Sequence, residues 1–170
     1  MTIRFGILTL SDRSSRGERA DSSGPAVAQL VLAEGWSVVK QAILPDKESA
    51  IREILTDWAD AGELDVILTT GGTGFSPRDV TPEATRAILE RETPGLAEAM
   101  RAASLKVTPH AMLSRIVTGI RKKTLIINLP GSPKGAVENL QVVIPVLPHA
   151  VQLLQGDPAS ESTHSRSSPQ

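Results

Sequence analysis

Apolar runs alternate with segments rich in Gly, Pro, Ser and Asp along most of this chain. Runs such as IRFGILTL and TLIINL are mostly apolar, which is typical of strands buried on both faces of a sheet. Between the runs, apolar residues recur at helical spacing. The predicted strands cover residues 3–10, 36–44, 65–70, about 116–120 and 124–129, and the predicted helices cover 25–34, 47–61, about 133–142 and 145–156, with two more starting at Thr81 and Thr93.

Three of these helices start at residues that favour a helix N-terminus. Asp46 is predicted to cap the helix over 47–61, because a short carboxylate can accept hydrogen bonds from the first free N–H groups. Thr81 and Ser132 each precede a proline, and proline suits the first helical position.

The alternation of strands and helices predicts an α/β domain whose mainly parallel sheet is covered on both faces. In such sheets, ligands bind beyond the carboxyl ends of the strands. This rule selects residues 11–24, 44–47, 71–82 and 130–135 as the segments that form a binding site. The Gly, Pro, Asp and Ser residues concentrate in the same segments.

The 170 residues, of which 40% are hydrophobic, fit one globular domain. We predict that this domain covers residues 1–156. Residues 157–170 are rich in Ser and Pro and have no apolar periodicity, so they are predicted to form a disordered tail.

Composition narrows the classes of function. A net charge of −1 and an aromatic content of 2% argue against a nucleic-acid partner. The chain has no Cys and three His, which excludes a cysteine nucleophile and argues against a zinc site. The N-terminus becomes polar too soon for a signal peptide, and no apolar run approaches the ~20 residues of a membrane span. A cytoplasmic protein with no membrane partner is therefore expected.

A glycine-rich segment, made of Gly71, Gly72, Thr73 and Gly74, follows a predicted buried strand directly. Glycines allow a sharp turn and bring backbone N–H groups close to a ligand. The segment indicates either a phosphate-binding nest or simply a tight turn between a strand and a helix. It is neither a Walker A loop nor a dinucleotide fingerprint, because the residues that define those motifs are missing.

Two carboxylates lie in the segments selected above. Asp46 and Asp79 follow different strands, and together they can share a hard cation such as Mg²⁺ that also holds substrate phosphates. The alternatives are an N-cap for Asp46 and a loop-stabilising turn for Asp79. Arg78 is expected to pair with Asp79 or to hold a phosphate. Asp12 and Asp21 lie in the first loop and are weaker candidates, because charges in polar loops are usually solvated.

The turn that follows the last predicted strand has two interpretations. Ser132 caps the next helix, and the N–H groups of that helix start can also face a phosphate. Lys134 adds a positive charge nearby.

Longer motifs occur in order along the chain, namely TLSDRSSRGERADSSGP, LPDKE, TTGGTGFSPRDVTPEAT, RETPGL, TPHAMLSR and LIINLPGSPKGAVE. Together they resemble the molybdopterin-binding domain family. Its members include the bacterial molybdopterin adenylyltransferases and the G domains of the plant and animal molybdenum-cofactor proteins. The resemblance covers residues 3 to 156, and it implies a three-layer α/β/α fold with a mostly parallel sheet and one antiparallel edge strand.

The resemblance also implies an activity. AMP would pass from ATP to the terminal phosphate of molybdopterin, with release of pyrophosphate and a requirement for Mg²⁺. A homotrimer is implied as well, and its product would go to another protein that inserts molybdate. Two alternatives stay open: a carrier or trimeric scaffold that binds molybdopterin without turnover, and a nucleotide-binding regulator without a pterin partner.

The resemblance assigns roles to individual residues. Asp46 and Asp79 match the carboxylates that are tied to catalysis and metal binding. The remaining matches are Gly71, Gly72, Thr73 and Gly74 for the nucleotide phosphates, Ser104 for the pterin, and Arg13, Ser114, Arg115 and Ser132 around the same crevice.

Overall fold

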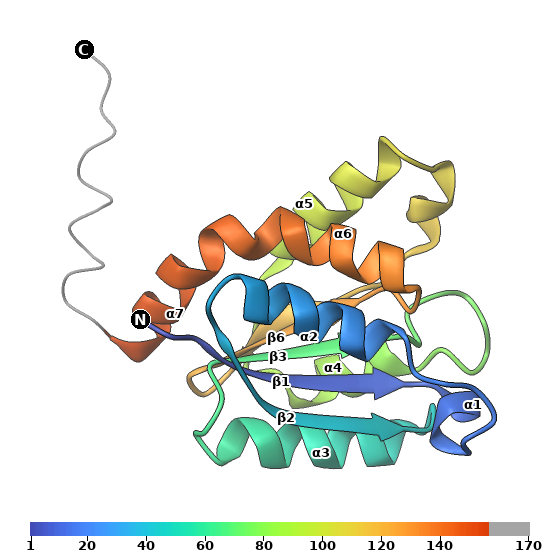
Figure 1. Cartoon of the computed structure of the whole chain (residues 1–170), viewed down its shortest axis with the longest axis horizontal. Coiled ribbons are helices and arrows are strands. Elements are labelled where there is room, and N and C mark those ends of the chain that lie inside the picture. The colour runs from blue at the N-terminus through green and yellow to red at the C-terminus, as the bar shows by residue number, and fades with distance from the viewer. Residues whose placement is uncertain (157–170) are drawn as a thin grey trace.

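The computed structural model describes residues 1–156, and a six-stranded sheet forms the middle of the molecule (Figure 1). The strands are β1 (Arg4–Leu10), β2 (Ser37–Leu44), β3 (Val66–Thr70), β4 (Arg91–Glu92), β5 (Thr118–Arg121) and β6 (Thr124–Leu129). Their order is β2-β1-β3-β6-β5-β4; β1, β2, β3 and β6 pair in parallel, and β5 runs antiparallel to both of its neighbours. The predicted tail, 157–170, lies outside the described residues.

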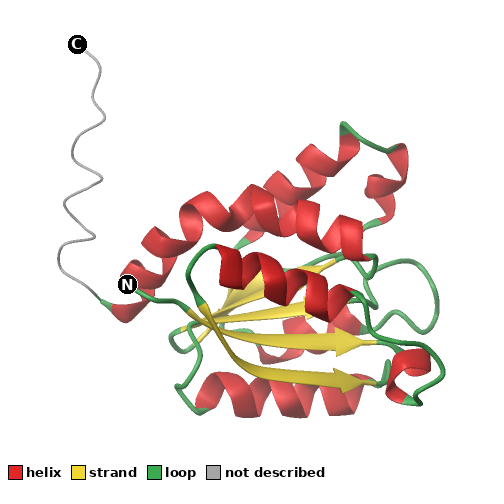
Figure 2. Cartoon of the chain, in the orientation of Figure 1, coloured by secondary structure: helices red, strands yellow, loops and turns green. Residues whose placement is uncertain are grey.

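Helices cover both faces of the sheet and make the fold three-layered (Figures 1 and 2). They are α1 (Asp12–Ser15), α2 (Ser23–Ala33), α3 (Glu48–Asp60), α4 (Thr81–Ile88), α5 (Pro94–Leu105), α6 (Pro133–Val143) and α7 (Leu147–Gln155), with the 3₁₀ helices η1 (Pro109–Leu113) and η2 (Ile144–Val146). Residues of α2, α5, α6 and α7 pack on one face, and residues of α3 and α4 pack on the other. The predicted α/β/α architecture is therefore confirmed.

The apolar runs of the sequence correspond to strands with two buried faces. In β3, Leu68 packs into the core beneath α2 and α6, whereas its neighbour Ile67 packs into the core beneath α3 and α4. Ile127 and Ile126 of β6 divide between the same two cores. Since successive side chains of a strand point to opposite faces, both faces must be apolar here, and no polar alternation remains.

The structure corrects two of the three predicted N-caps. Lys47, not Asp46, occupies the N-cap position of α3, and its side chain makes no capping bond. Val80 precedes α4, so Thr81 lies inside the helix. The Ser132 prediction is confirmed, because its hydroxyl accepts a hydrogen bond from the Gly135 amide at the start of α6. Asp46 and Thr81 instead bond to the loops that form the site described below.

The helical stretch Pro133–Gln155, 23 residues long, is long and apolar enough to cross a membrane by length and composition alone. This finding differs from the expectation that no apolar run approaches the length of a membrane span. The apolar residues Leu140, Val143, Leu147 and Val151 of this stretch are buried in the core beneath α6 and α7. Packing in the core accounts for these four apolar positions, whereas Val146 and Leu153 of the same stretch are exposed.

Candidate functional site

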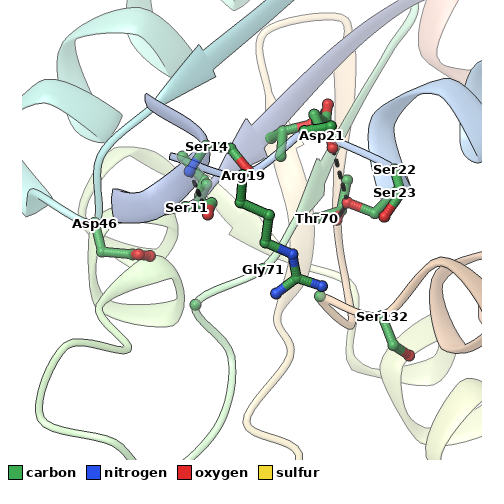
Figure 3. Close-up of a pocket in the computed structure, with 15 residues that line it drawn as sticks. Ser11, Ser14, Arg19, Asp21, Ser22, Ser23, Asp46, Thr70, Gly71 and Ser132 are labelled. Atoms are coloured by element: carbon green, nitrogen blue, oxygen red, sulfur yellow. Dashed lines mark hydrogen bonds between the residues drawn. The ribbon is translucent and has the colours of Figure 1, made fainter. Parts of the chain in front are cut away.

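A polar pocket of about 360 Å³ lies beyond the carboxyl ends of β1 and β3 (Figure 3). Hydroxyl groups, glycine backbone and the carboxylates of Asp21 and Asp46 form its walls. We call it the polar pocket. It is lined by Thr9, Leu10, Ser11, Ser14, Arg19, Ala20, Asp21, Ser22, Ser23, Asp46, Thr70, Gly71, Gly72, Gly131 and Ser132.

A second pocket, of about 310 Å³, adjoins the first at Ser132, which lines both. Its walls combine the apolar side chains of Val107, Ala111, Leu113 and Pro130 with polar groups, and we call it the mixed pocket. The glycine-rich loop runs between the two pockets. Its first two residues, Gly71 and Gly72, line the polar pocket, and its last two, Thr73 and Gly74, line the mixed pocket.

Backbone geometry explains why this loop is rich in glycine. Gly71 has a φ of +103°, and a Cβ added there would lie 2.3 Å from the Leu10 carbonyl oxygen. Gly72 has a φ of +65°. The Thr81 hydroxyl donates to the Gly71 carbonyl oxygen at 2.9 Å, and the Gly71 amide donates to the Leu129 carbonyl at 3.2 Å. Helix α4 and strand β6 therefore hold the loop in a conformation that other residues adopt only with strain.

Asp46 reaches this loop from the end of β2. Its Oδ2 accepts a hydrogen bond from the Asp12 amide at 3.2 Å, while its buried Oδ1 has no hydrogen-bond partner. A Cβ on Gly72 would lie 2.8 Å from that unpartnered oxygen, so the glycine leaves room beside it. Burial raises the pKa of Asp46, and the nearby charges of Asp12 and Asp79 raise it further.

The interpretation of Asp12 as a solvated charge is wrong. Its Oδ1 accepts the Asp46 amide at 2.9 Å, so the two aspartates bond to each other's backbone. The guanidinium of Arg78 donates to both carboxylate oxygens of Asp12, at 2.9 and 2.8 Å. This hydrogen-bonded pairing lowers the pKa of Asp12. Arg78 therefore pairs with Asp12 rather than with Asp79, and it ties the 71–80 loop to the start of α1, just after β1.

Asp79 closes a turn within that loop. Its Oδ2 accepts the Ser76 amide at 2.9 Å, and its own amide donates to the Ser76 carbonyl at 2.9 Å. A Cβ on Gly74 would lie 2.9 Å from the same Oδ2. The predicted stabilising turn is therefore present, and the proposed role of Asp79 in metal binding stays a prediction.

Arg115 holds the same loop from the other side. Its guanidinium donates to the Gly74 carbonyl at 2.8 Å and to the Asp79 carbonyl at 2.7 Å, and it pairs with Glu83. Its backbone amide donates to the Thr73 carbonyl at 2.9 Å. With these contacts, Arg115 positions the segment from Thr73 to Asp79.

The polar groups of the mixed pocket come from α5, from α6 and from the loops around them. The amide of Asn139, 5% exposed, donates to the Ser104 hydroxyl at 3.2 Å and to the Gly135 carbonyl at 2.8 Å. The Ser114 hydroxyl oxygen is buried without a hydrogen-bond partner. The Arg101 side chain donates to the Ser114 carbonyl at 3.2 Å and to that of Ile116.

Asp21 is not a solvated charge either, because its hydrogen bonds hold one wall of the polar pocket in place. It accepts hydrogen bonds from the Thr9 hydroxyl at 2.8 Å and the Gly24 amide at 3.1 Å. Ser23, two residues further on, accepts from the Thr70 hydroxyl at 2.7 Å. These bonds attach the start of α2 to the ends of β1 and β3.

The structure brings most of the predicted site residues to the two pockets. Asp46, Gly71, Gly72 and Ser132 line the polar pocket, and Thr73, Gly74, Ser104, Ser114 and Ser132 line the mixed pocket. Arg13, Asp79, Arg115 and Lys134 line neither of them. The sequence analysis missed the wall residues Arg19 and Asn139 and ranked Asp12 and Asp21 as weaker candidates. Of these four residues, all but Asn139 lie in segments that the strand-end rule selects.

A family model described as a probable molybdopterin binding domain matches residues 6–149, a range that contains every residue lining the two pockets. The chain belongs to this family. It is 42% identical over 158 residues to a molybdopterin adenylyltransferase of Helicobacter pylori strain J99, an alignment that covers 92% of this chain and 90% of the relative.

Longer proteins contain a related segment. The chain is 45% identical to gephyrin of Dictyostelium discoideum over 96% of its own length, but it spans about a quarter of gephyrin, 24%. Among solved structures, the molybdopterin biosynthesis enzyme MoaB of Thermus thermophilus superposes with a TM-score of 0.86 at 53% identity, covering 92% of this chain and 99% of the other.

Proposed function

We propose that this protein transfers AMP from ATP to the terminal phosphate of molybdopterin and releases pyrophosphate. A phosphate oxygen of the pterin would attack the α-phosphorus of ATP. The bond from that phosphorus to the oxygen bridging to the β-phosphate would break, and pyrophosphate would leave with the electron pair. The name of the Helicobacter pylori relative, which this chain matches over most of its length, supports the proposal.

The observation that carries the proposal is the pair of adjoining pockets. The polar pocket suits phosphates, because hydroxyl groups, glycine backbone and Arg19 line it. The mixed pocket suits a pterin, because apolar walls can cover a flat ring while Ser104 and Asn139 offer polar contacts. Since Ser132 lines both, the two substrates would meet beside it, at the start of α6.

This chemistry matches the side chains of the site. A phosphate nucleophile is already ionised at neutral pH, so transfer needs no protein base. The absence of Cys from the chain is therefore no obstacle to this reaction. The main tasks of the protein are to orient the phosphates and to offset their charge. The Gly71 amide is bonded to Leu129 and the Gly135 amide to Ser132, so the N–H groups of Gly72 and of Lys134 at the start of α6 would serve both tasks.

Asp46 and Asp79 are the residues that would hold Mg²⁺. The fit rests on the buried Oδ1 of Asp46, which has no hydrogen-bond partner and lies beside Gly72, where a Cβ would crowd it. Within residues 1–156, no group of three or more His, Cys, Asp or Glu side chains is arranged to hold a metal ion. The two carboxylates would therefore share the ion with substrate phosphates, which is how proteins usually bind Mg²⁺. When bound, Mg²⁺ would offset phosphate charge.

We also propose that the protein works in the cytoplasm as a homotrimer and passes its product to a molybdate-insertion protein. The resemblance to the adenylyltransferases supports these points. Light scattering tests the assembly directly: a trimer has three times the 18.0 kDa mass of the chain.

Pyrophosphate release tests the proposed activity. Wild-type protein with ATP and Mg²⁺ should release pyrophosphate only when molybdopterin is present, and Asp79→Asn should lower the rate at least about tenfold while the fold is kept. Release that ignores molybdopterin would contradict the proposal. Tight molybdopterin binding without any release would favour the carrier or scaffold alternative.

A further inference from the structure

Most of the arginines near the two pockets are already engaged by the protein. Arg78 donates to Asp12, Arg115 to the loop around Gly74, and Arg101 to the carbonyl groups of Ser114 and Ile116. A phosphate could recruit one of these side chains only by breaking its present contacts. None of the three lines the polar pocket.

Arg19 differs from these arginines. It is the single basic residue among those that line the polar pocket. In the view of Figure 3 its side chain extends across the pocket, and its guanidinium end projects between Gly71 and Ser132, which line the same pocket. Within the described residues its side chain has neither a hydrogen-bond partner nor an ion-pair partner.

The neighbouring charges explain why Arg19 is unpaired. Glu18, the carboxylate next to it in sequence, is bound by Arg16 through two hydrogen bonds at 2.8 and 3.0 Å. Asp21 is engaged by Thr9 and by the start of α2. Arg19 therefore faces a pocket that suits anions, and no carboxylate has to be displaced for it to bind one.

We propose that Arg19 binds the phosphates of ATP in the polar pocket, as a further substrate-binding residue. This inference rests on the proposed function. A guanidinium presents several N–H donors in one plane, a geometry that matches phosphate oxygens, and it keeps its charge at any physiological pH. Arg19 supplies the positive charge that the predicted residues Arg13 and Lys134 do not bring to this pocket: neither lines it, and Lys134 is 81% exposed and pairs with Glu138.

Titration calorimetry with inorganic pyrophosphate and with ATP tests the proposal without any need for turnover. Arg19→Ala should weaken both affinities about tenfold to a hundredfold, the range for losing a charged hydrogen bond. Arg19→Lys should restore part of the loss, because a lysine keeps the charge without the planar donors. Arg52→Ala is the control, since Arg52 lies on α3, pairs with Glu48 and lines neither pocket, and it should leave both affinities unchanged.

The remaining outcomes separate this inference from the proposed function. Equal affinity of Arg19→Ala and wild type for both ligands, or no binding of either by the wild type, would overturn the role of Arg19. Molybdopterin affinity should stay unchanged in Arg19→Ala, and a matching loss there would show a general disturbance of the site and also overturn it. If wild type binds ATP through Arg19 but releases no pyrophosphate with molybdopterin, only the proposed transfer reaction fails.

Discussion

At the scale of single residues, the site holds an aspartate in an unfavourable setting. One oxygen of the Asp46 carboxylate is buried without a partner, and burial raises the pKa of the side chain. A buried carboxylate without compensation costs folding free energy. Such residues are common where an ion or substrate is to be bound, because the ligand supplies the missing contact.

Asp46→Asn should therefore separate stability from activity. The amide keeps the acceptor for the Asp12 N–H group but removes the buried charge. We expect the thermal midpoint to stay equal or to rise, while pyrophosphate release falls at least about a hundredfold. Calorimetry and the release assay measure the two effects. A clear drop in the midpoint would mean that Asp46 serves the fold instead.

Arg115 acts through the loop that it holds. A lysine there cannot bond to Gly74, Asp79 and Glu83 together, because its donors leave from a single nitrogen. We predict that Arg115→Lys lowers kcat about tenfold or more by releasing the segment that carries Asp79. The KM for molybdopterin should change little. Unchanged kcat would show that the loop keeps its conformation without the guanidinium.

At the scale of elements, the glycine-rich loop depends on a close approach between β1 and β3. Gly71→Ala would place a Cβ 2.3 Å from the Leu10 carbonyl oxygen at a φ of +103°. The strain alone costs about 1–3 kcal/mol, so the free energy of unfolding should fall by at least that amount. Gly95→Ala is the control, because a Cβ there meets nothing within 4 Å. Denaturation curves that show equal stability for both variants would contradict this account of the loop.

An ion pair with a buried carboxylate joins three parts of the chain at the opposite end of the sheet. Asp65, 5% exposed, accepts hydrogen bonds from the Arg4 backbone and side chain and from Gln155 at the end of α7. Burial alone would raise the pKa of Asp65, but the bonds and the charge of Arg4 outweigh burial and hold it below its ordinary value. At pH values above the ordinary pKa of an aspartate, the charged carboxylate therefore stabilises the fold.

This pair predicts a defined pH dependence. The contribution of the pair to the unfolding free energy should be complete above pH ~4, the ordinary pKa of an aspartate. It should be lost as the pH falls further and passes the lowered pKa of Asp65. Asp65→Asn should reduce the unfolding free energy at pH 7 by about 1–3 kcal/mol and flatten its decline below pH ~4. Urea denaturation at several pH values measures both. An unchanged slope in the variant would show that other carboxylates cause the acid sensitivity.

The elements that the sequence predicted well are those whose pattern is dictated by burial. The buried runs of β3 and β6 have two apolar faces, so their positions follow from the sequence alone. The short elements α1, β4 and η1 were missed, because four, two and five residues are too few for a periodic pattern.

The details of the site were less accessible from the sequence. The bond between Asp12 and Asp46 joins residues 34 positions apart, and it depends on how two loops meet. Local capping preference assigned Asp46 to a helix start, whereas the tertiary contact with Asp12 determines its position. Arg19 faces the polar pocket only because the loop after α1 folds back over it, and a sequence pattern does not encode that arrangement.

At the scale of the whole molecule, the two cores leave the carboxyl end of the sheet free for the site. The apolar groups of α2 and α6 on one face, and of α3 and α4 on the other, are buried away from the two pockets. Loops from four strand ends therefore meet over a rigid base. This arrangement can hold two substrates side by side, which transfer between phosphates requires.

Transfer of label from ATP to the pterin tests the proposed reaction most directly. With ATP labelled in the α-phosphate, Mg²⁺ and molybdopterin, the proposed reaction predicts that the label appears in a pterin product in equal amount to the pyrophosphate released. With ATP labelled in the γ-phosphate, the label should appear only in pyrophosphate. Binding of both substrates with no α-label in the pterin would contradict adenylyl transfer and leave a molybdopterin-binding protein without this activity.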